Sequence, residues 1–138
     1  MKAVFVCMHG NAARELIQSA EMICGEQENV GYTFFDTGET PEDLAVKIEH
    51  AVTKLNVDEG ILFLTDLKGG TPFNVLVRNL DKFVQAELLT GVNIPMLLEA
   101  LISRGLFSLT DLANQVLETG KLGIYRYEEP KKFEDDDF

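Results

Sequence analysis

One continuous apolar run in the middle of the chain constrains the fold more than any other feature. Residues 60–65 read Gly-Ile-Leu-Phe-Leu-Thr, with no charged residue among them. A strand with one face in water alternates apolar and polar residues, whereas a strand covered on both faces can be apolar throughout. The run therefore predicts a buried strand of a parallel sheet that carries helices on both faces.

Strand-like and helix-like patterns alternate along the rest of the chain. Strands are expected over about 3–8, 30–35, 60–65 and 84–89. Helices are expected between Asn11 and Gly25, from Thr40 to about Leu55, from Thr71 onward, from Ile94 to Ser103, and from Leu109 to Glu118 with Gly120 past its end. Repeated strand–helix units favour right-handed crossovers and a parallel sheet. We therefore predict an open α/β fold with four parallel strands in the order 2-1-3-4.

The C-terminal residues show a weaker pattern. Residues 123–127 are typical of a short final strand, and the charged residues 128–138 are expected to be a disordered tail. No internal repeat or linker-like segment interrupts the chain. We therefore expect one domain over 1–127, followed by the acidic tail.

The charge balance argues against nucleic acid as a partner. The formal net charge is -11, of which residues 128–138 contribute -4 and the rest -7. Binding to a phosphate backbone needs a basic face, which neither part offers. A basic protein partner is easier to accommodate.

The cysteines and the N-terminal residues suggest a reduced, cytoplasmic protein. Cys7 and Cys24 both lie in apolar surroundings, which predicts two buried, reduced thiols. Together with His9 they lack the usual spacing of zinc ligands. The apolar run 3–8 is too short for a signal peptide or a membrane span.

The chemically interesting residues follow the first and third predicted strands. His9 comes directly after the first strand and Asp66 directly after the third. In the order 2-1-3-4 these strands are neighbours, and ligands bind where the strand order reverses, at the carboxyl ends of the strands. A carboxylate that accepts the proton of one imidazole nitrogen leaves the other nitrogen free to attack phosphorus. Taken singly, His9 could be an ordinary loop histidine and Asp66 an ordinary cap, but their coincidence favours a site. His50, on a polar helix face, is expected to be solvated.

Donors for a bound phosphoryl group are expected beside this pair. Exposed backbone N–H groups at helix starts bind anions, and glycine lets the backbone approach closely. The candidate phosphate-binding residues are Gly10, Asn11, Gly69, Gly70 and Thr71. No metal or other cofactor is needed, because transfer between imidazoles requires positioning and charge stabilisation.

Several motifs, in order, resemble the mannose-family IIA domains of the bacterial phosphotransferase system. The similarity covers about residues 1–125. The motifs are Met8-His9-Gly10 with Ala12-Ala13, Ala20-Glu21-Met22, Gly25-Glu26-Gln27-Glu28-Asn29-Val30, Leu62-Phe63-Leu64-Thr65-Asp66 with Gly69-Gly70-Thr71-Pro72-Phe73-Asn74, and Thr90-Gly91-Val92-Asn93-Ile94-Pro95-Met96-Leu97.

The resemblance implies a specific role. His9 matches the histidine that accepts a phosphoryl group from the phosphohistidine carrier HPr, and Asp66 matches its carboxylate partner. The group then passes to a IIB protein, here expected on a separate chain, and supports sugar uptake through membrane IIC and IID proteins. The family also implies a homodimer that exchanges an antiparallel C-terminal strand, which matches residues 123–127. Mannose, fructose, sorbose, a hexosamine or a sugar acid such as gluconate all remain open as the sugar.

The chain departs from the family pattern at the rim of the site. Asn11 and Lys68 stand where a familiar member has large aromatic residues, and Thr71 stands where the family often has serine. These differences concern contacts with partners more than the chemistry.

Three alternatives remain open from the sequence. A phosphocarrier subunit of a dihydroxyacetone kinase uses a similar domain. A receiver-like domain would be phosphorylated on Asp66, but it would need an acidic metal pocket where this chain has His9. A flavin-binding electron carrier would need a Ser/Thr-rich loop after the first strand.

Overall fold

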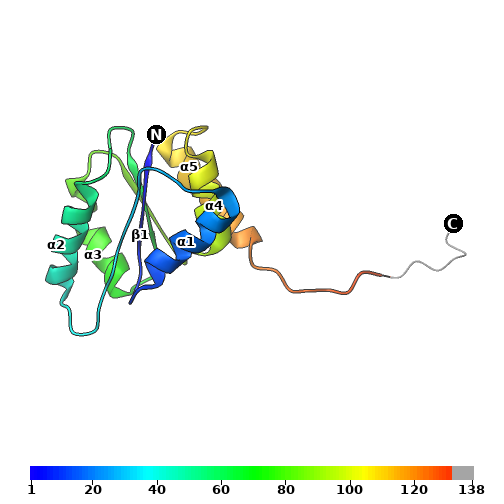
Figure 1. Cartoon of the computed structure of the whole chain (residues 1–138), viewed down its shortest axis with the longest axis horizontal. Coiled ribbons are helices and arrows are strands. Elements are labelled where there is room, and N and C mark those ends of the chain that lie inside the picture. The colour runs from blue at the N-terminus through cyan, green and yellow to red at the C-terminus, as the bar shows by residue number, and fades with distance from the viewer. Residues whose placement is uncertain (132–138) are drawn as a thin grey trace, which may run out of the picture.

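The computed structural model describes residues 1–131 and shows one parallel sheet between two layers of helices (Figure 1). The sheet has the predicted order β2-β1-β3-β4, and every strand pair is parallel. Its strands are β1 (Ala3–Cys7), β2 (Val30–Thr33), β3 (Ile61–Thr65) and β4 (Ala86–Thr90). The predicted α/β class and strand order are confirmed.

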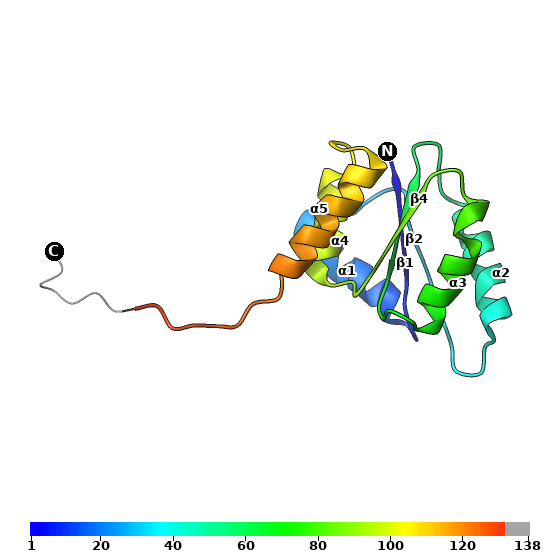
Figure 2. The same ribbon diagram turned by 180° about the vertical axis from the view of Figure 1, so that it is seen from behind.

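Helices cover both faces of the sheet, as Figures 1 and 2 show from opposite sides. One face carries α1, α4 and α5, and the other carries α2 and α3. Their bounds are α1 (Ala12–Cys24), α2 (Pro41–Val52), α3 (Thr71–Asn79), α4 (Ile94–Ser103) and α5 (Leu109–Leu122), with a short 3-10 turn η1 (Leu80–Lys82) after α3.

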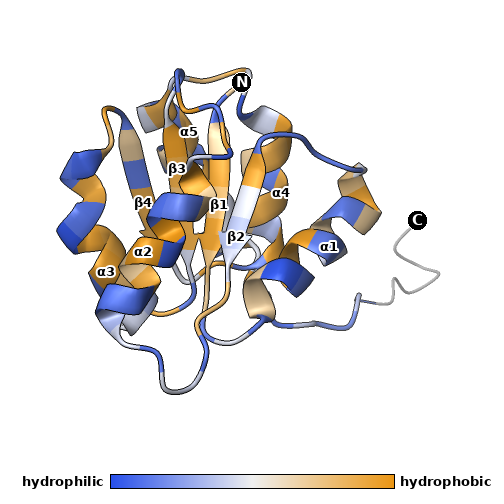
Figure 3. Ribbon diagram, turned by 60° about the vertical axis from the view of Figure 1, so that its left-hand side comes forward, coloured by the Kyte–Doolittle hydropathy of each residue, from blue (hydrophilic) through white to orange (hydrophobic). Residues whose placement is uncertain are grey.

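The continuous apolar run has the predicted cause. In β3, Leu62 and Leu64 are buried against the layer of α1, α4 and α5, while Ile61 and Phe63 are buried in the core on the α2–α3 side. The strand therefore needs apolar residues at every position, and Figure 3 shows the central strands in the hydrophobic colour along much of their length.

The second helix begins as its sequence predicts. The Thr40 hydroxyl accepts a hydrogen bond from the Asp43 N–H at 3.1 Å, and the Asp43 carboxylate accepts one from the Thr40 N–H at 3.0 Å. This reciprocal capping box satisfies N–H groups that have no partner inside the helix. Pro41 occupies the first helical position, where its missing N–H costs nothing.

The first strand ends one residue earlier than predicted, at Cys7, and two other elements end earlier by two or three residues. The second strand ends at Thr33 instead of Phe35, and the second helix ends at Val52 instead of Leu55. Phe35 leaves the sheet because its backbone pairs with Gly10 instead. Residues after Val52 turn back toward the third strand.

The last helix is longer than predicted. It runs to Leu122, with Gly120 inside it and not past its end. A Cβ atom on Gly120 would lie 2.5 Å from the Met96 Cγ, so the glycine permits close packing of α5 on α4. Its value here is the missing side chain, which overrides its usual tendency to end helices.

The C-terminal prediction has a mixed outcome. Residues 124–131 form no strand in this chain, so the expected strand over 123–127 is not seen in the single protomer. An exchanged strand would need a second protomer, and that part stays a prediction. The tail residues 128–131 are exposed and irregular, and 132–138 lie outside the described residues.

The cysteines differ from each other. Cys7 is buried, as predicted, whereas Cys24 is only half-buried, so its expected burial was wrong. Both are free thiols. Burial raises the pKa of the Cys7 thiol to about 12, with the charge of Asp66 acting in the same direction and Lys47 opposing it. Across residues 1–131, no helix is both long and apolar enough to cross a bilayer.

Candidate functional site

The two central strands bring His9 and Asp66 together. Their last residues, Cys7 and Thr65, are paired neighbours in the sheet. His9 follows Cys7 by two positions and Asp66 follows Thr65 directly, so both side chains lie at the same carboxyl edge. The strand order reverses between β1 and β3, so the two side chains lie at the expected position for a ligand site.

The His9 side chain is held through one oxygen of Asp66. Its Nδ1 lies 2.7 Å from the Asp66 Oδ2, and the His9 backbone N–H donates to the same oxygen at 3.1 Å. An ionised carboxylate can only accept, so Nδ1 carries the proton and Nε2 carries the lone pair. The side chain of His9 is 47% exposed and that of Asp66 22%. The pair thus places a half-exposed imidazole, held through Nδ1, at this edge of the sheet.

The electrostatics of Asp66 favour its charged form. Partial burial raises the pKa of the carboxyl, but the hydrogen bonds from the His9 ring and backbone and the attraction to His9 outweigh it. The net pKa lies below its ordinary value. The other oxygen, Oδ1, is buried and has no hydrogen-bond partner among the described residues.

Two of the predicted amide donors are already engaged. The Gly10 N–H donates to the Phe35 carbonyl at 2.8 Å, and the Gly70 N–H donates to the Leu67 carbonyl at 3.0 Å. Both residues still lie at the site, where Gly70 adjoins the ring: a Cβ atom on it would be 3.0 Å from the His9 Cε1. Gly70 therefore leaves space for the imidazole, although its N–H already donates to Leu67.

The remaining candidates open the two helices beside His9. Asn11 is the residue before α1, although its side chain makes no capping hydrogen bond. Thr71 before Pro72 is typical of a helix cap, but in the structure Gly70 is the cap and Thr71 is the first residue of α3. Gly69 has a φ of +80°, which shapes the turn. The first N–H groups of each helix have no partner within it, which suits an anion.

A hollow of about 480 Å³ adjoins the histidine on the side away from Asp66. It lies between residues 9–11 and residues 35–39. Two acids of its wall, Asp36 and Glu39, pair with Lys47 of α2. No group of three or more metal-ligating side chains occurs within residues 1–131.

Sequence reasoning missed Phe35. Its ring lies edge-to-face against the His9 ring, with centroids 5.8 Å apart. We assigned it to the end of the second strand. The rule that strands of a parallel sheet end at one edge would have placed it near His9.

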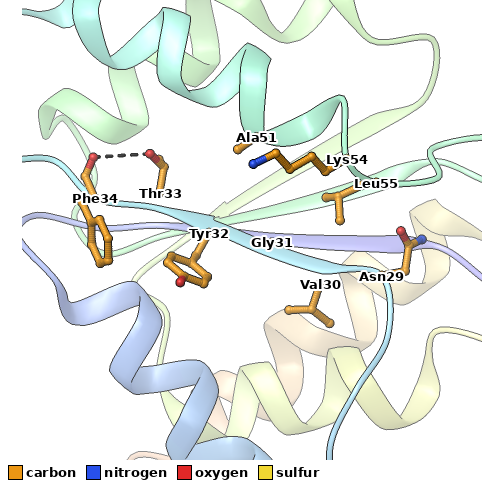
Figure 4. A pocket seen from close by; sticks show the side chains of 9 residues that line it. All are labelled: Asn29, Val30, Gly31, Tyr32, Thr33, Phe34, Ala51, Lys54 and Leu55. Atoms are coloured by element: carbon orange, nitrogen blue, oxygen red, sulfur yellow. Dashed lines mark hydrogen bonds between the residues drawn. The ribbon is translucent and has the colours of Figure 1, made fainter.

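A second hollow, of about 520 Å³, runs along the outer strand β2 and the end of α2 (Figure 4). Its wall contains Lys54 as its one ionisable amine, beside Tyr32 and several apolar or neutral side chains. No histidine or carboxylate lines it.

The fold and the site define an open α/β protein with a histidine–carboxylate pair where its strand order reverses. A family model described as "PTS system fructose IIA component" matches residues 3–117. The mannose-specific EIIAB component of Escherichia coli K12 is 42% identical over 123 residues, which are 88% of this chain and 38% of that protein. The fructose-specific EIIA component of Bacillus subtilis 168 is 34% identical over 116 residues, covering 84% of this chain and 80% of that one.

Solved structures agree with these similarities. A phosphotransferase system component EIIA from Streptococcus agalactiae superposes with a TM-score of 0.83 at 34% identity, covering 91% of this chain and 97% of that one. A mannose/sorbose specific IIA subunit from Enterococcus faecalis superposes with a TM-score of 0.87 at 25% identity, covering 96% and 100%. The chain belongs to the mannose-type EIIA family of the sugar phosphotransferase system. It spans 38% of the length of the Escherichia coli relative.

Proposed function

We propose that the protein is a phosphocarrier in which the Nε2 atom of His9 accepts a phosphoryl group from phospho-HPr and passes it to a IIB component. One observation carries the proposal. The Asp66 carboxylate engages Nδ1 at 2.7 Å, which leaves Nε2 of the half-exposed His9 ring as the nucleophile.

The transfer balances without a cofactor. The Nε2 lone pair forms a bond to phosphorus while the bond between phosphorus and the donor imidazole breaks, and that nitrogen keeps the electron pair. The proton on Nδ1 stays in its hydrogen bond to Asp66. The ring gains positive character as the bond forms, and the adjacent carboxylate stabilises it. Transfer to the IIB component reverses these steps.

The transferred group needs donors on its oxygens. We assign this role to the N-terminal ends of α1 and α3. Gly10 and Asn11 precede α1, Gly69 and Gly70 precede α3, and Thr71 is the first residue of α3. The Gly10 and Gly70 N–H groups are already hydrogen-bonded, so the other N–H groups at these helix starts and the Thr71 hydroxyl would supply the partial positive charge for the phosphate oxygens.

The receiver alternative fits the geometry poorly. A receiver would use an Asp66 oxygen as its nucleophile, but Oδ2 is occupied by two hydrogen bonds from His9 and Oδ1 is buried. The relatives named above are sugar-transport components, which favours the HPr-dependent role.

The wider setting follows the family. We propose that residues 1–127 act as the EIIA domain in the cytoplasm, with HPr as donor, a IIB protein as acceptor, and membrane IIC and IID proteins downstream. We further propose a homodimer joined through residues 123–127. The relatives are named for mannose, fructose and sorbose, so the sugar is left open.

The proposal is tested by intact-mass measurement. The protein is mixed with phosphoenolpyruvate, enzyme I and HPr, and one acid-labile phosphoryl group per chain is expected. Omission of HPr, or the His9→Ala variant, should abolish the gain. If the wild-type protein stays unmodified while a known IIA protein in the same mixture is phosphorylated, the proposal is wrong for that donor.

A further inference from the structure

A third segment of the chain, besides the two that carry the histidine and the carboxylate, contacts the His9 ring. Phe35, just after β2, meets the imidazole edge-to-face, with centroids 5.8 Å apart and planes inclined by 65°. Aromatic pairs favour this arrangement. Phe35 also packs on the buried cluster between the sheet and the α2–α3 layer. The histidine ring is thereby linked to the core through the phenyl ring.

The backbone ties the same two segments together. The Gly10 N–H donates to the Phe35 carbonyl at 2.8 Å, and the Phe35 N–H donates to the Gly10 carbonyl at 3.3 Å. This antiparallel bridge lies outside the four-stranded sheet. Gly10 has a φ of +63°, which glycine adopts easily. Phe35 is therefore held at a fixed place relative to His9.

The carboxylate alone does not fix the plane of the imidazole. A single oxygen, Oδ2 of Asp66, accepts from both the ring and the backbone of His9. One acceptor atom defines a point about which the ring can still tilt. Gly70 has no Cβ and leaves space beside Cε1. The Phe35 ring, in contact with the imidazole, limits this tilt.

We propose that Phe35 is a positioning residue, whose ring holds the His9 imidazole in the plane that aims Nε2 at a docked phosphoryl donor. The inference rests on the proposed phosphocarrier function. In-line transfer between two docked proteins tolerates little misalignment. A small, freely diffusing donor approaches Nε2 in any ring orientation and is much less sensitive to the plane.

The test compares two donors on matched variants. Phe35→Leu keeps an apolar side chain but removes the aromatic edge, and Phe35→Met is a second non-aromatic variant with a more adaptable shape. Phe34→Leu is the control, because the Phe34 ring pairs with the Tyr32 ring, with centroids 5.5 Å apart. Figure 4 shows both side chains beside the hollow. The donors are phospho-HPr and phosphoramidate, and single-turnover rates are followed by intact mass.

Phe35→Leu and Phe35→Met should slow transfer from phospho-HPr about tenfold or more, with phosphoramidate affected less than about threefold. Both variants should still reach one phosphoryl group per chain. Phe34→Leu should change either rate by less than about twofold. An equal loss with both donors, or no loss with phospho-HPr, would overturn the positioning role.

A spectroscopic readout separates this inference from the proposed function. In NMR spectra of the unphosphorylated protein, the carbon-bound ring protons of His9 should shift in Phe35→Leu, because the neighbouring ring current is lost, and remain in place in Phe34→Leu. Unchanged His9 signals in Phe35→Leu would also overturn the inference. If wild-type protein takes no phosphoryl group from phospho-HPr, the proposed function fails, while the NMR comparison still decides whether Phe35 contacts the His9 ring.

Discussion

At the scale of single residues, the site depends on one short hydrogen bond with a charged acceptor. Such bonds contribute about 1.5–3 kcal/mol, more than a neutral pair. Asp66 uses this bond to set the tautomer of His9, and His9 in turn favours the ionised form of Asp66. Each residue thus prepares the other for the proposed transfer.

The Asp66→Asn variant should therefore transfer phosphoryl groups about 10- to 100-fold more slowly, because the amide cannot stabilise the charge that develops on the ring. Rapid-quench measurement with phospho-HPr would give the rate. Unchanged rates would show that the carboxylate has no part in the chemistry.

The same pair should make stability depend on pH. The pKa of Asp66 is lower in the folded protein than its ordinary value, so its ionised form stabilises the fold above about pH 4, the unfolded pKa, and this stabilisation is lost as the pH falls through the folded pKa. Urea unfolding of wild type and Asp66→Asn should show the largest gap in unfolding free energy at pH 5–7. The gap should shrink toward pH 3, and a constant gap would contradict this assignment.

At the scale of elements, two glycines allow neighbouring segments to pack closely, because a Cβ atom at either position would collide with a nearby side chain. Gly70 has no Cβ to collide with His9, and Gly120 has none to collide with Met96. The first approach is at the site, and the second is between α4 and α5. Substitution at the two positions should therefore affect different properties.

Gly70→Ala should slow phosphoryl transfer about tenfold or more, because its Cβ would lie 3.0 Å from the His9 Cε1 and push the ring out of place. The φ of Gly70 is -72°, so alanine fits the backbone and the fold should persist. Gly105→Ala, with no atom within 4 Å of the added Cβ, is the matched control. Equal rates in both variants would show that the ring does not need this space.

Gly120→Ala should lower the unfolding free energy by about 1–3 kcal/mol, since an added methyl group overpacks the contact of α5 with α4. Urea titration would measure the loss. Phosphoryl transfer at low temperature should remain close to wild type, and a more stable variant would show that α4 and α5 can separate freely.

The sequence predicted elements well where local chemistry and burial agreed. The apolar run 60–65 and the helix start at Thr40 each have one structural meaning, and both were confirmed. Gly120 was misread, because a glycine that ends a helix and one that admits a neighbouring helix look alike in sequence. Phe35 was missed as a neighbour of His9, because its contact joins residues 9 and 35 through a bridge outside the sheet.

At the scale of the whole molecule, the C-terminal segment after α5 carries apolar side chains that are exposed to solvent. Ile124, Tyr125 and Tyr127 are 82%, 76% and 72% exposed in the single protomer. Apolar residues grouped in this way favour an interface. They fit the proposed dimer, in which a second protomer would cover them.

The full chain should therefore be a dimer of about twice 15.4 kDa by light scattering after gel filtration. A chain truncated after Leu122 should be a monomer, whereas one truncated after Lys131 should remain a dimer. A full-length monomer, or a dimer that persists without residues 123–131, would contradict the proposed exchange.

The central claim concerns one nitrogen atom, and NMR of the phosphorylated protein tests it directly. Long-range ¹H–¹⁵N spectra, with ³¹P coupling, distinguish a phosphoryl group on Nε2 from one on Nδ1. The 2.7 Å bond between Nδ1 and Asp66 predicts phosphorylation of His9 on Nε2, with Nδ1 still protonated. A phosphoryl group on Nδ1, or an acyl phosphate on Asp66, would contradict the account.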